Sequence, residues 1–122
     1  MSVRIVVADD EADILRLVAF TLRRRGYTVL EAVDGEQALQ LIRAELPDLA
    51  VLDVMMPMLS GLDVVREMAA NTATANIPVL IVSAKGQATD IEAGLATGAA
   101  SYLPKPFSPR VLADRVASIL EQ

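Results

Sequence analysis

The sequence lacks both cysteine and histidine. Without cysteine the chain has no disulfide, no zinc–thiolate site and no thiol nucleophile. Without histidine it lacks the commonest general base and carries no phosphohistidine of its own. Long apolar runs are also missing, and no basic segment leads into an apolar one, so we expect neither a membrane span nor a signal peptide. These absences predict a cytoplasmic protein that makes no contact with a membrane.

Positive charge is scarce, because 11 Lys and Arg residues stand against 16 Asp and Glu, a formal net charge of −5. Nucleic acids and anionic membranes attract clustered cations, so we expect no direct binding to nucleic acid. The one basic cluster, Arg23–Arg25, falls at the end of a predicted helix, where it complements the helix dipole. With 53% hydrophobic residues in 122, the chain is long enough for one domain with a single core.

Short apolar runs alternate with amphipathic segments along the whole chain. Runs rich in Val, Ile and Leu without a helical period are typical of central strands in a parallel sheet. Right-handed crossovers between such strands give a doubly wound α/β sheet with helices on both faces. We expect strands at residues 3–8, 27–31, 48–53, 77–83 and 101–104, and helices at 11–25, 36–44, from 61, 88–97 and 109–120.

Acidic side chains follow two of the predicted strands. Asp9 and Asp10 come after the first strand, and Asp53 ends the third. If these strands are neighbours, the three carboxylates meet at the carboxyl end of the sheet, where ligands bind in such folds. At about 5 Å and an effective dielectric near 20, each pair repels by roughly 3 kcal/mol. Such a cluster favours a hard cation, Mg²⁺ (or Mn²⁺).

The ordered set of polar residues after the strands resembles the receiver domain of two-component response regulators: Asp9-Asp10, Asp53, Ser83-Ala84 and Lys105-Pro106. The resemblance covers the whole chain and implies a flavodoxin-like (βα)5 fold with strand order 2-1-3-4-5. It implies phosphorelay signalling, in which Asp53 accepts a phosphoryl group from a partner histidine kinase or phosphotransfer protein. The protein would be a phosphoacceptor switch with slow self-catalysed reactions, not an enzyme. Since the chain stops after the last helix, we expect a single receiver domain, 1–122, with no effector domain.

The resemblance also assigns roles near Asp53. Mg²⁺ would be held by Asp9, Asp10, Asp53 and the backbone carbonyl of Met55. Lys105 would supply the fixed positive charge and would be aimed at the acids by a cis peptide before Pro106. Asp10 and Glu11 also fit a helix N-cap with an acidic first turn, and we assign Glu11 and Asp13 to the helix dipole alone.

Ser83 would bond a phosphoryl oxygen, and Tyr102 would act as the switch residue whose ring turns inward when Ser83 moves. A turn role for Ser83 and simple core packing for Tyr102 are the structural alternatives. Two departures from the common family pattern tune the lifetime of the phosphoryl group: Met55 is apolar, and Lys85 adds a cation. Gly61 suits a backbone position that only glycine can occupy.

We expect the kinase to dock on the first helix, where Phe20 points outward as a candidate contact. The inward face of that helix is predicted to hold Ile14, Leu17, Val18, Thr21 and Leu22. A weak phosphorylation-dependent homodimer is expected on the face made by the fourth helix, the fifth strand and the fifth helix. Its apolar patch would come from Leu95 and Ala113, and its ion pairs from Asp90, Arg110, Asp114 and Arg115.

Two other functions remain open. A phosphohydrolase that passes through an aspartyl phosphate would need an Asp-x-Asp arrangement after its first strand, whereas Asp9-Asp10 is followed here by Glu11 and Ala12. A phosphate-independent interaction module on the same fold would not need the full set of acids, hydroxyl and lysine.

Overall fold

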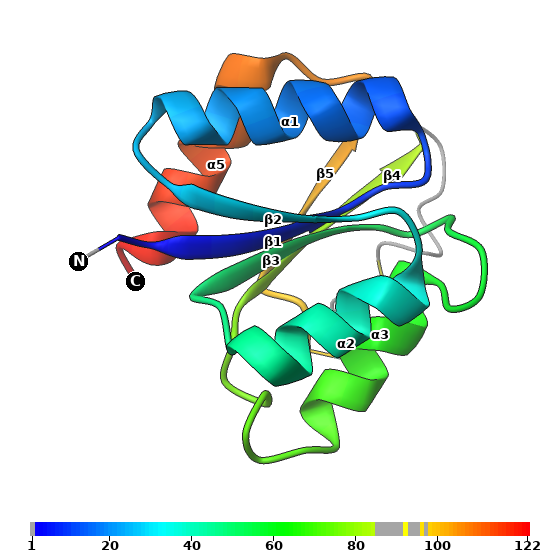
Figure 1. The fold of residues 1–122 in the computed structure, drawn as a ribbon. Helices are drawn as coiled ribbons and strands as arrows, with labels where there is room; N and C mark the ends of the chain where they lie inside the picture. Colours follow the sequence, from blue (N-terminus) through cyan, green and yellow to red (C-terminus); the bar gives the residue numbers. More distant parts are fainter. Residues whose placement is uncertain (1, 85–91, 93–95, 97) are drawn as a thin grey trace.

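The computed structural model describes residues 2–84, 92, 96 and 98–122. Five parallel strands form one sheet in the order β2-β1-β3-β4-β5 (Figure 1). This order confirms the flavodoxin-like fold expected from the sequence. The strands are β1 (Arg4–Ala8), β2 (Thr28–Ala32), β3 (Leu49–Asp53), β4 (Val79–Ala84) and β5 (Ser101–Lys105), and the helices are α1 (Ala12–Arg24), α2 (Gly35–Glu45), α3 (Gly61–Ala69) and α5 (Pro109–Leu120).

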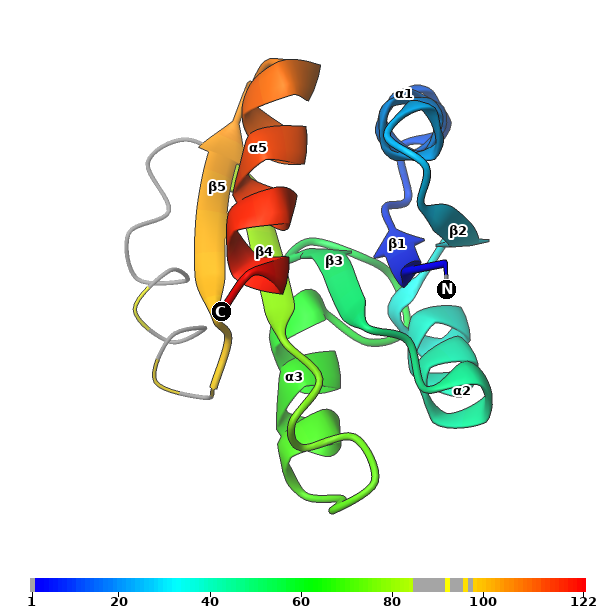
Figure 2. The ribbon, with the colours of Figure 1, turned by 90° about the vertical axis from the view of Figure 1, so that its left-hand side faces the viewer.

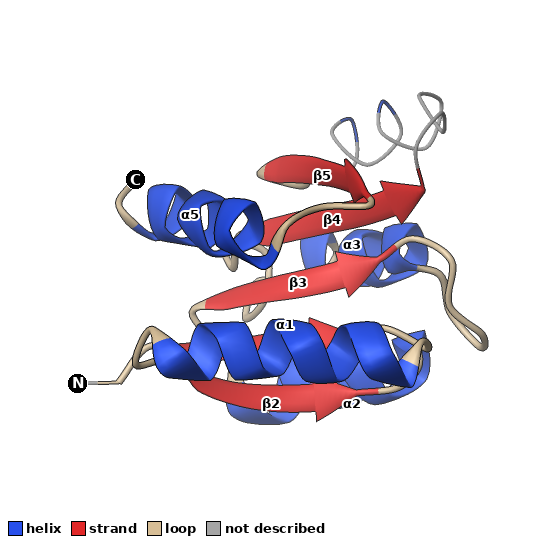
Figure 3. Cartoon of the chain, turned by 90° about the horizontal axis from the view of Figure 1, so that it is seen from above, coloured by secondary structure: helices blue, strands red, loops and turns tan. Residues whose placement is uncertain are grey.

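Two helical layers cover the sheet. Figure 2 shows α1 and α5 on one face and α2 and α3 on the other. Successive side chains of a strand point to opposite faces of the sheet, so β1 and β3 contribute side chains to the core on both faces. Their sequences are therefore continuous apolar runs. Every residue of β3 is buried. Seen from above, the carboxyl ends of the strands lie together at one end of the sheet (Figure 3).

Local signals fix where the helices begin. Asp34 accepts a hydrogen bond from the backbone N–H of Gln37 and caps α2. Ser60 and Asp63 form a reciprocal capping box at the start of α3. Ser108 caps α5 by accepting from the N–H of Val111. These caps satisfy backbone donors that a helix leaves unpaired in its first turn.

Two glycines let the loop after β3 pack tightly. A Cβ on Gly61 would lie 2.4 Å from the carbonyl oxygen of Asp53, and one on Gly35 would lie 1.9 Å from that of Leu59. Neither contact is possible for a larger residue without moving backbone. The expectation that only glycine fits at position 61 is therefore confirmed, and the close approach fixes the segment that follows Asp53.

Some expectations about faces were wrong. On α1 the buried side chains are those of Leu15, Val18, Ala19 and Leu22, whereas Leu17 is 45% exposed. The inward stripe is rotated because α1 packs against α5 as well as against the sheet. Phe20 is 58% exposed, as expected.

The predicted dimer face also needs correction. Ala113 is fully buried in the core between α5 and the sheet and cannot join a surface patch. Arg115 donates to Ser101 Oγ at 2.9 Å and to the carbonyl of Tyr102 at 2.7 Å, so it serves the fold. Asp90 and Leu95 lie outside the described residues, and of the helix expected over 88–97 only residues 92 and 96 are described. No helix among the described residues has the length and apolar character needed to cross a bilayer.

Candidate functional site

The acidic residues after β1 and β3 meet at the carboxyl end of the sheet. β1 pairs directly with β3, with Ala8 opposite Leu52, so Asp9 and Asp53 follow at the same level. One ligand oxygen from each of Asp9, Asp10 and Asp53 lies within 4.8 Å of the others. Asp9 and Asp53 are each only 4% exposed, while Asp10 faces solvent. The structure thus brings together the three carboxylates that sequence analysis grouped.

Lys105 reaches this cluster from the end of β5. Its Nζ lies 3.2 Å from Asp9 Oδ2 and 3.2 Å from Asp53 Oδ2. The Lys105–Pro106 peptide bond is cis, as the resemblance implied. One partly buried ammonium is therefore shared between two buried carboxylates from different strands.

The carboxylates outnumber the cation, and the ionisation of Asp53 reflects this. The pKa of Asp53 is raised from 3.8 to about 6, first by burial and then by the charge of Asp9, while Lys105 and the backbone N–H of Met55 only partly offset these two effects. Burial lowers the pKa of Lys105, but Asp53 and Asp9 outweigh burial and leave that pKa above its usual value. The site is short of positive charge in the absence of a further cation.

Ser83 lies next to this cluster at the end of β4. In the register of the sheet Val82 is opposite Asp53, so Ser83 is one residue further along. Ser83 is fully buried, and its Oγ has no hydrogen-bond partner within the described part of the chain. A buried hydroxyl without a partner is uncommon, since leaving it unpaired costs about 1–3 kcal/mol. Such an atom is free to bond an incoming oxygen.

Tyr102 and Ser83 share one face of the sheet. Tyr102 is opposite Ile81, and Ile81 and Ser83 point to the same side because strand side chains alternate. The half-buried Tyr102 packs against the core layer that also holds α2 and α3. This arrangement is compatible with both roles given to Tyr102, packing and switching.

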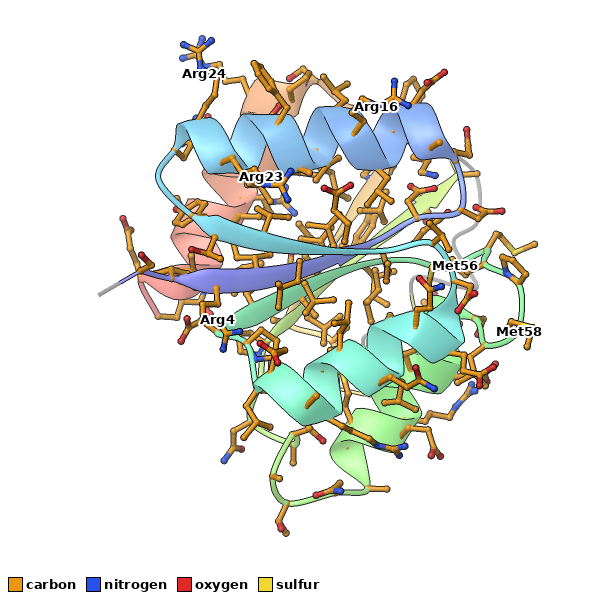
Figure 4. All side chains as sticks on the ribbon, viewed as in Figure 1. Arg4, Arg16, Arg23, Arg24, Met56 and Met58 are labelled. Carbon is orange, nitrogen blue, oxygen red and sulfur yellow. The ribbon has the colours of Figure 1, made fainter. Side chains whose placement is uncertain are left out.

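Of the two positions predicted to tune the lifetime of the phosphoryl group, Met55 and Lys85, the structure describes only Met55. The side chain of Met55 is 63% exposed beside the site, and its backbone N–H bonds Asp53. Lys85 lies outside the described residues. Figure 4 shows Met56 and Met58 at this end of the molecule, on the loop after β3.

Glu11 is the site residue that sequence reasoning missed. It was assigned to the helix dipole alone, yet its carboxylate lies 3.4 Å from Lys105 Nζ and makes no capping bond at the start of α1. Glu11 and Lys105 also border an apolar surface cavity of about 380 Å³, whose other lining residues are Ile14, Leu17, Ala84, Pro106 and Phe107. The sequence holds no local signal for this contact, because Lys105 is 94 residues away.

The chemistry of the donor set fits a divalent cation. Three carboxylates lie close enough together to hold a metal ion, and Lys105 is the one described lysine that contacts the buried pair, Asp9 and Asp53. Oxygen donors of this kind favour Mg²⁺. Within the described residues no other group of acids has this geometry. A cation at this position would offset the repulsion from Asp9 that, after burial, raises the pKa of Asp53.

Comparisons with known proteins agree with this geometry. Residues 5–117 match the response regulator receiver domain family. The chain is 43% identical over 122 residues to the alkaline phosphatase synthesis transcriptional regulatory protein PhoP of Bacillus subtilis, covering 100% of this chain and 50% of that protein. It is 37% identical to the phosphate regulon transcriptional regulatory protein PhoB of Escherichia coli, covering 100% of this chain and 53% of that protein.

Among solved structures, a putative response regulator from Chloroflexus aurantiacus superposes with a TM-score of 0.94 at 34% identity and full coverage of both chains. The chain spans about half the length of the curated relatives it matches. Its fold, its acidic pocket and these matches agree on a phosphoacceptor switch in phosphorelay signalling, not a conventional enzyme. The chain belongs to the response regulator receiver domain family.

Proposed function

We propose that Asp53 is the phosphoacceptor and that the donor is a phosphohistidine on a histidine kinase or phosphotransfer protein. The observation that carries the proposal is the Lys105 ammonium, which lies 3.2 Å from both Asp53 and Asp9. In the reaction an oxygen of Asp53 attacks phosphorus and the phosphorus–nitrogen bond breaks. The imidazole of the donor leaves, and an acyl phosphate remains on Asp53.

Lys105 and Ser83 are the groups we assign to the transferred phosphoryl group. The ammonium of Lys105 would exchange part of its contact with Asp53 for a phosphoryl oxygen, a charge-assisted bond. The buried Oγ of Ser83, which has no partner in the described ranges, would donate to another phosphoryl oxygen. Movement of Ser83 would change the packing on its face of the sheet, where Tyr102 lies, and alter partner binding.

Asp9, Asp10 and Asp53, with the backbone carbonyl of Met55, would hold Mg²⁺ or Mn²⁺. When bound, the metal supplies positive charge to the phosphoryl oxygens and to the crowded carboxylates. Glu11, through its contact with Lys105, would help to position the ammonium. Met55 and Lys85 remain our candidates for tuning the lifetime of the phosphoryl group.

The partners follow from this chemistry. The kinase would approach the acidic pocket beside α1, where Phe20 is exposed. For self-association we expect a monomer without phosphate and at most a weak dimer with beryllofluoride, because two of the charges of α5 are engaged within the chain: Asp114 with Arg25 and Arg115 with Ser101. Sedimentation at rising concentration tests this, and a tight dimer without the mimic would contradict it.

Labelling by acetyl phosphate tests the phosphoacceptor directly. With Mg²⁺, mass spectrometry should show one added phosphoryl group on the wild type and none on Asp53→Asn. Asp34→Asn is the matched control, because asparagine caps α2 as well as aspartate does. It should be labelled like the wild type. Labelling that persists in Asp53→Asn, or in excess chelator, would refute the proposal.

A further inference from the structure

A cationic groove lies between the C-terminal half of α1 and the start of α5. It has a volume of about 370 Å³ and is lined by Phe20, Thr21, Arg24, Arg25 and Arg110. The guanidinium of Arg24 lies 5.8 Å from the centroid of the exposed Phe20 ring. Arg24 and Arg25 are at the opposite end of α1 from Glu11 and the acidic pocket (Figure 1). In a chain with a net charge of −5, this concentration of cations stands out.

Most of the positive charge in the cationic groove is not neutralised. Arg25 pairs with Asp114 at 2.9 Å, and Arg110 lies 4.0 Å from the same carboxylate. Arg24 has no carboxylate partner in the part of the chain that the structure describes. Among the described residues, the three guanidinium groups of the groove therefore have a single carboxylate between them, that of Asp114, which Arg25 and Arg110 share.

Arg23 shows the contrast within the same basic cluster. It pairs with Glu31 at 2.9 Å and donates to the carbonyl of Val29, so it is used by the fold. In Figure 4 Arg23 turns towards the sheet, whereas Arg24 points away from it. The cluster therefore divides into one internal arginine and two that border the groove.

Helix electrostatics do not account for the whole groove. Cations near the end of α1 complement its dipole, which explains Arg23 and Arg24. Arg110, however, lies in the first turn of α5, where a cation is unfavourable and where no acidic residue is present. Its side chain is 88% exposed, so packing does not require it either. Apart from its long i,i+4 contact with Asp114, Arg110 contributes to the groove and not to its own helix.

We propose that the cationic groove binds an acidic segment of the phosphodonor protein, a proposal that rests on the phosphotransfer to Asp53 proposed above. Carboxylates of the segment pair with Arg24 and Arg110, and an apolar side chain packs on Phe20. Ile14 and Leu17 of the same helix line the cavity beside Lys105. From Ile14 to Arg24 the helix rises about 15 Å, so a partner helix of about three turns covers both the reactive pocket and the groove.

A protein segment fits the charges better than a long polyanion does. The carboxylates of the rest of the chain repel a nucleic acid or an anionic membrane that extends beyond the groove. In physiological salt, screening limits the attraction between the arginines and a partner's carboxylates to about 8 Å. A short acidic segment that lies in the groove is within this distance. Opposite charges on the partner speed encounter and select it among similar donors.

Transfer from a phosphorylated kinase tests the groove. The probe is the histidine kinase of the source organism that transfers fastest to the wild type, phosphorylated with ATP beforehand. The groove variant is Arg24→Glu with Arg110→Glu, and the matched control is Arg43→Glu with Arg66→Glu, which changes the net charge equally on α2 and α3. Kinase transfer and acetyl phosphate labelling are measured for each protein at two salt concentrations.

We expect kcat/KM for kinase transfer to fall roughly tenfold or more in the groove variant, through KM, because two ion pairs become repulsions. The control should stay within about twofold and the salt dependence should weaken in the groove variant alone. Acetyl phosphate labelling should be equal in all three proteins.

Three results would overturn the proposal. These are unchanged transfer to the groove variant, equal slowing in the control, and equal loss of acetyl phosphate labelling in the groove variant. Binding of duplex DNA or phosphatidylglycerol vesicles to the wild type but not to the groove variant would reassign the surface to a polyanion. Failure of acetyl phosphate to label the wild type would instead remove the proposed function itself.

Discussion

The two ends of the sheet treat charge in opposite ways. At the amino end, Arg4 forms an ion pair with Glu45, and its backbone N–H donates to Asp48 Oδ2 at 2.8 Å. Arg4 and Glu45 are partly exposed and neutralise each other, and the exposed Asp48 accepts from a backbone N–H. At the carboxyl end, Asp9 and Asp53 are buried together and share Lys105.

The difference shows which end carries function. Exposed ion pairs cost little and contribute about 0–1 kcal/mol, so the amino end is what folding alone would select. Buried carboxylates without enough cations oppose folding, as does the buried Ser83 hydroxyl, which has no partner among the described residues. Natural sequences keep such local conflicts mainly at functional sites. The account therefore predicts that changes at the carboxyl end have larger and less usual effects.

The largest effect should come from Gly61. Its Cβ would meet the carbonyl oxygen of Asp53 at 2.4 Å, so Gly61→Ala should lower the free energy of unfolding by about 2–4 kcal/mol. Gly26→Ala, at φ +92° but with open space around it, should cost only about 1–2 kcal/mol. Urea denaturation measures both. Equal costs would mean that the tight approach beneath Asp53 is not a constraint.

Asp53→Asn should stabilise the protein in chelator at neutral pH. Because the folded state raises the pKa of Asp53 to about 6, its contribution to stability is complete below pH 3.8 and is lost as the pH rises through 6. A neutral asparagine avoids that loss, about 2–3 kcal/mol at pH 7. The gain should shrink towards zero near pH 4. Asp48→Asn at the amino end is the control, and a similar gain there would contradict the comparison.

Lys105→Ala should leave the fold intact but uncouple phosphorylation of Asp53 from the change at Tyr102. The variant lacks the ammonium that we assign to the phosphoryl group, or its mimic, at Asp53. Beryllofluoride should therefore no longer shift the NMR signals of the Tyr102 ring. In the wild type these signals should shift on addition of beryllofluoride with Mg²⁺. Tyr27, which packs in the other core layer, serves as the internal reference. An undiminished Tyr102 shift in the variant would remove Lys105 from the coupling.

The smallest effect should come from the amino end. Arg4→Ala removes a partly exposed ion pair and should cost about 1 kcal/mol or less, with the rate of acetyl phosphate labelling unchanged. Thermal unfolding and labelling of the same sample measure the two quantities. A cost above that of Gly61→Ala would reverse the contrast between the ends.

The sequence predicted the site because its residues follow strands. An acid directly after an apolar run marks the carboxyl end of a parallel strand, so the sequence predicts that Asp9 and Asp53 meet if their strands are neighbours. The inward face of α1 could not be predicted as accurately. The sequence allows either Leu15 or Leu17 to point inward, and the packing of α1 against α5 determines which of them is buried. Met58 adopts φ 73° without being glycine, and no local pattern indicates this.

The most direct test of the central claim is the titration of Asp53 itself. The claim is that the carboxyl end holds carboxylates in excess of their cation and is completed by a divalent metal. The ¹³C signal of the Asp53 carboxyl group, assigned by comparison with Asp53→Asn, reports its pKa with and without Mg²⁺. We expect a pKa of about 6 in chelator and a clear fall with Mg²⁺. A pKa near 3.8 in chelator, or one that Mg²⁺ does not change, would contradict the account.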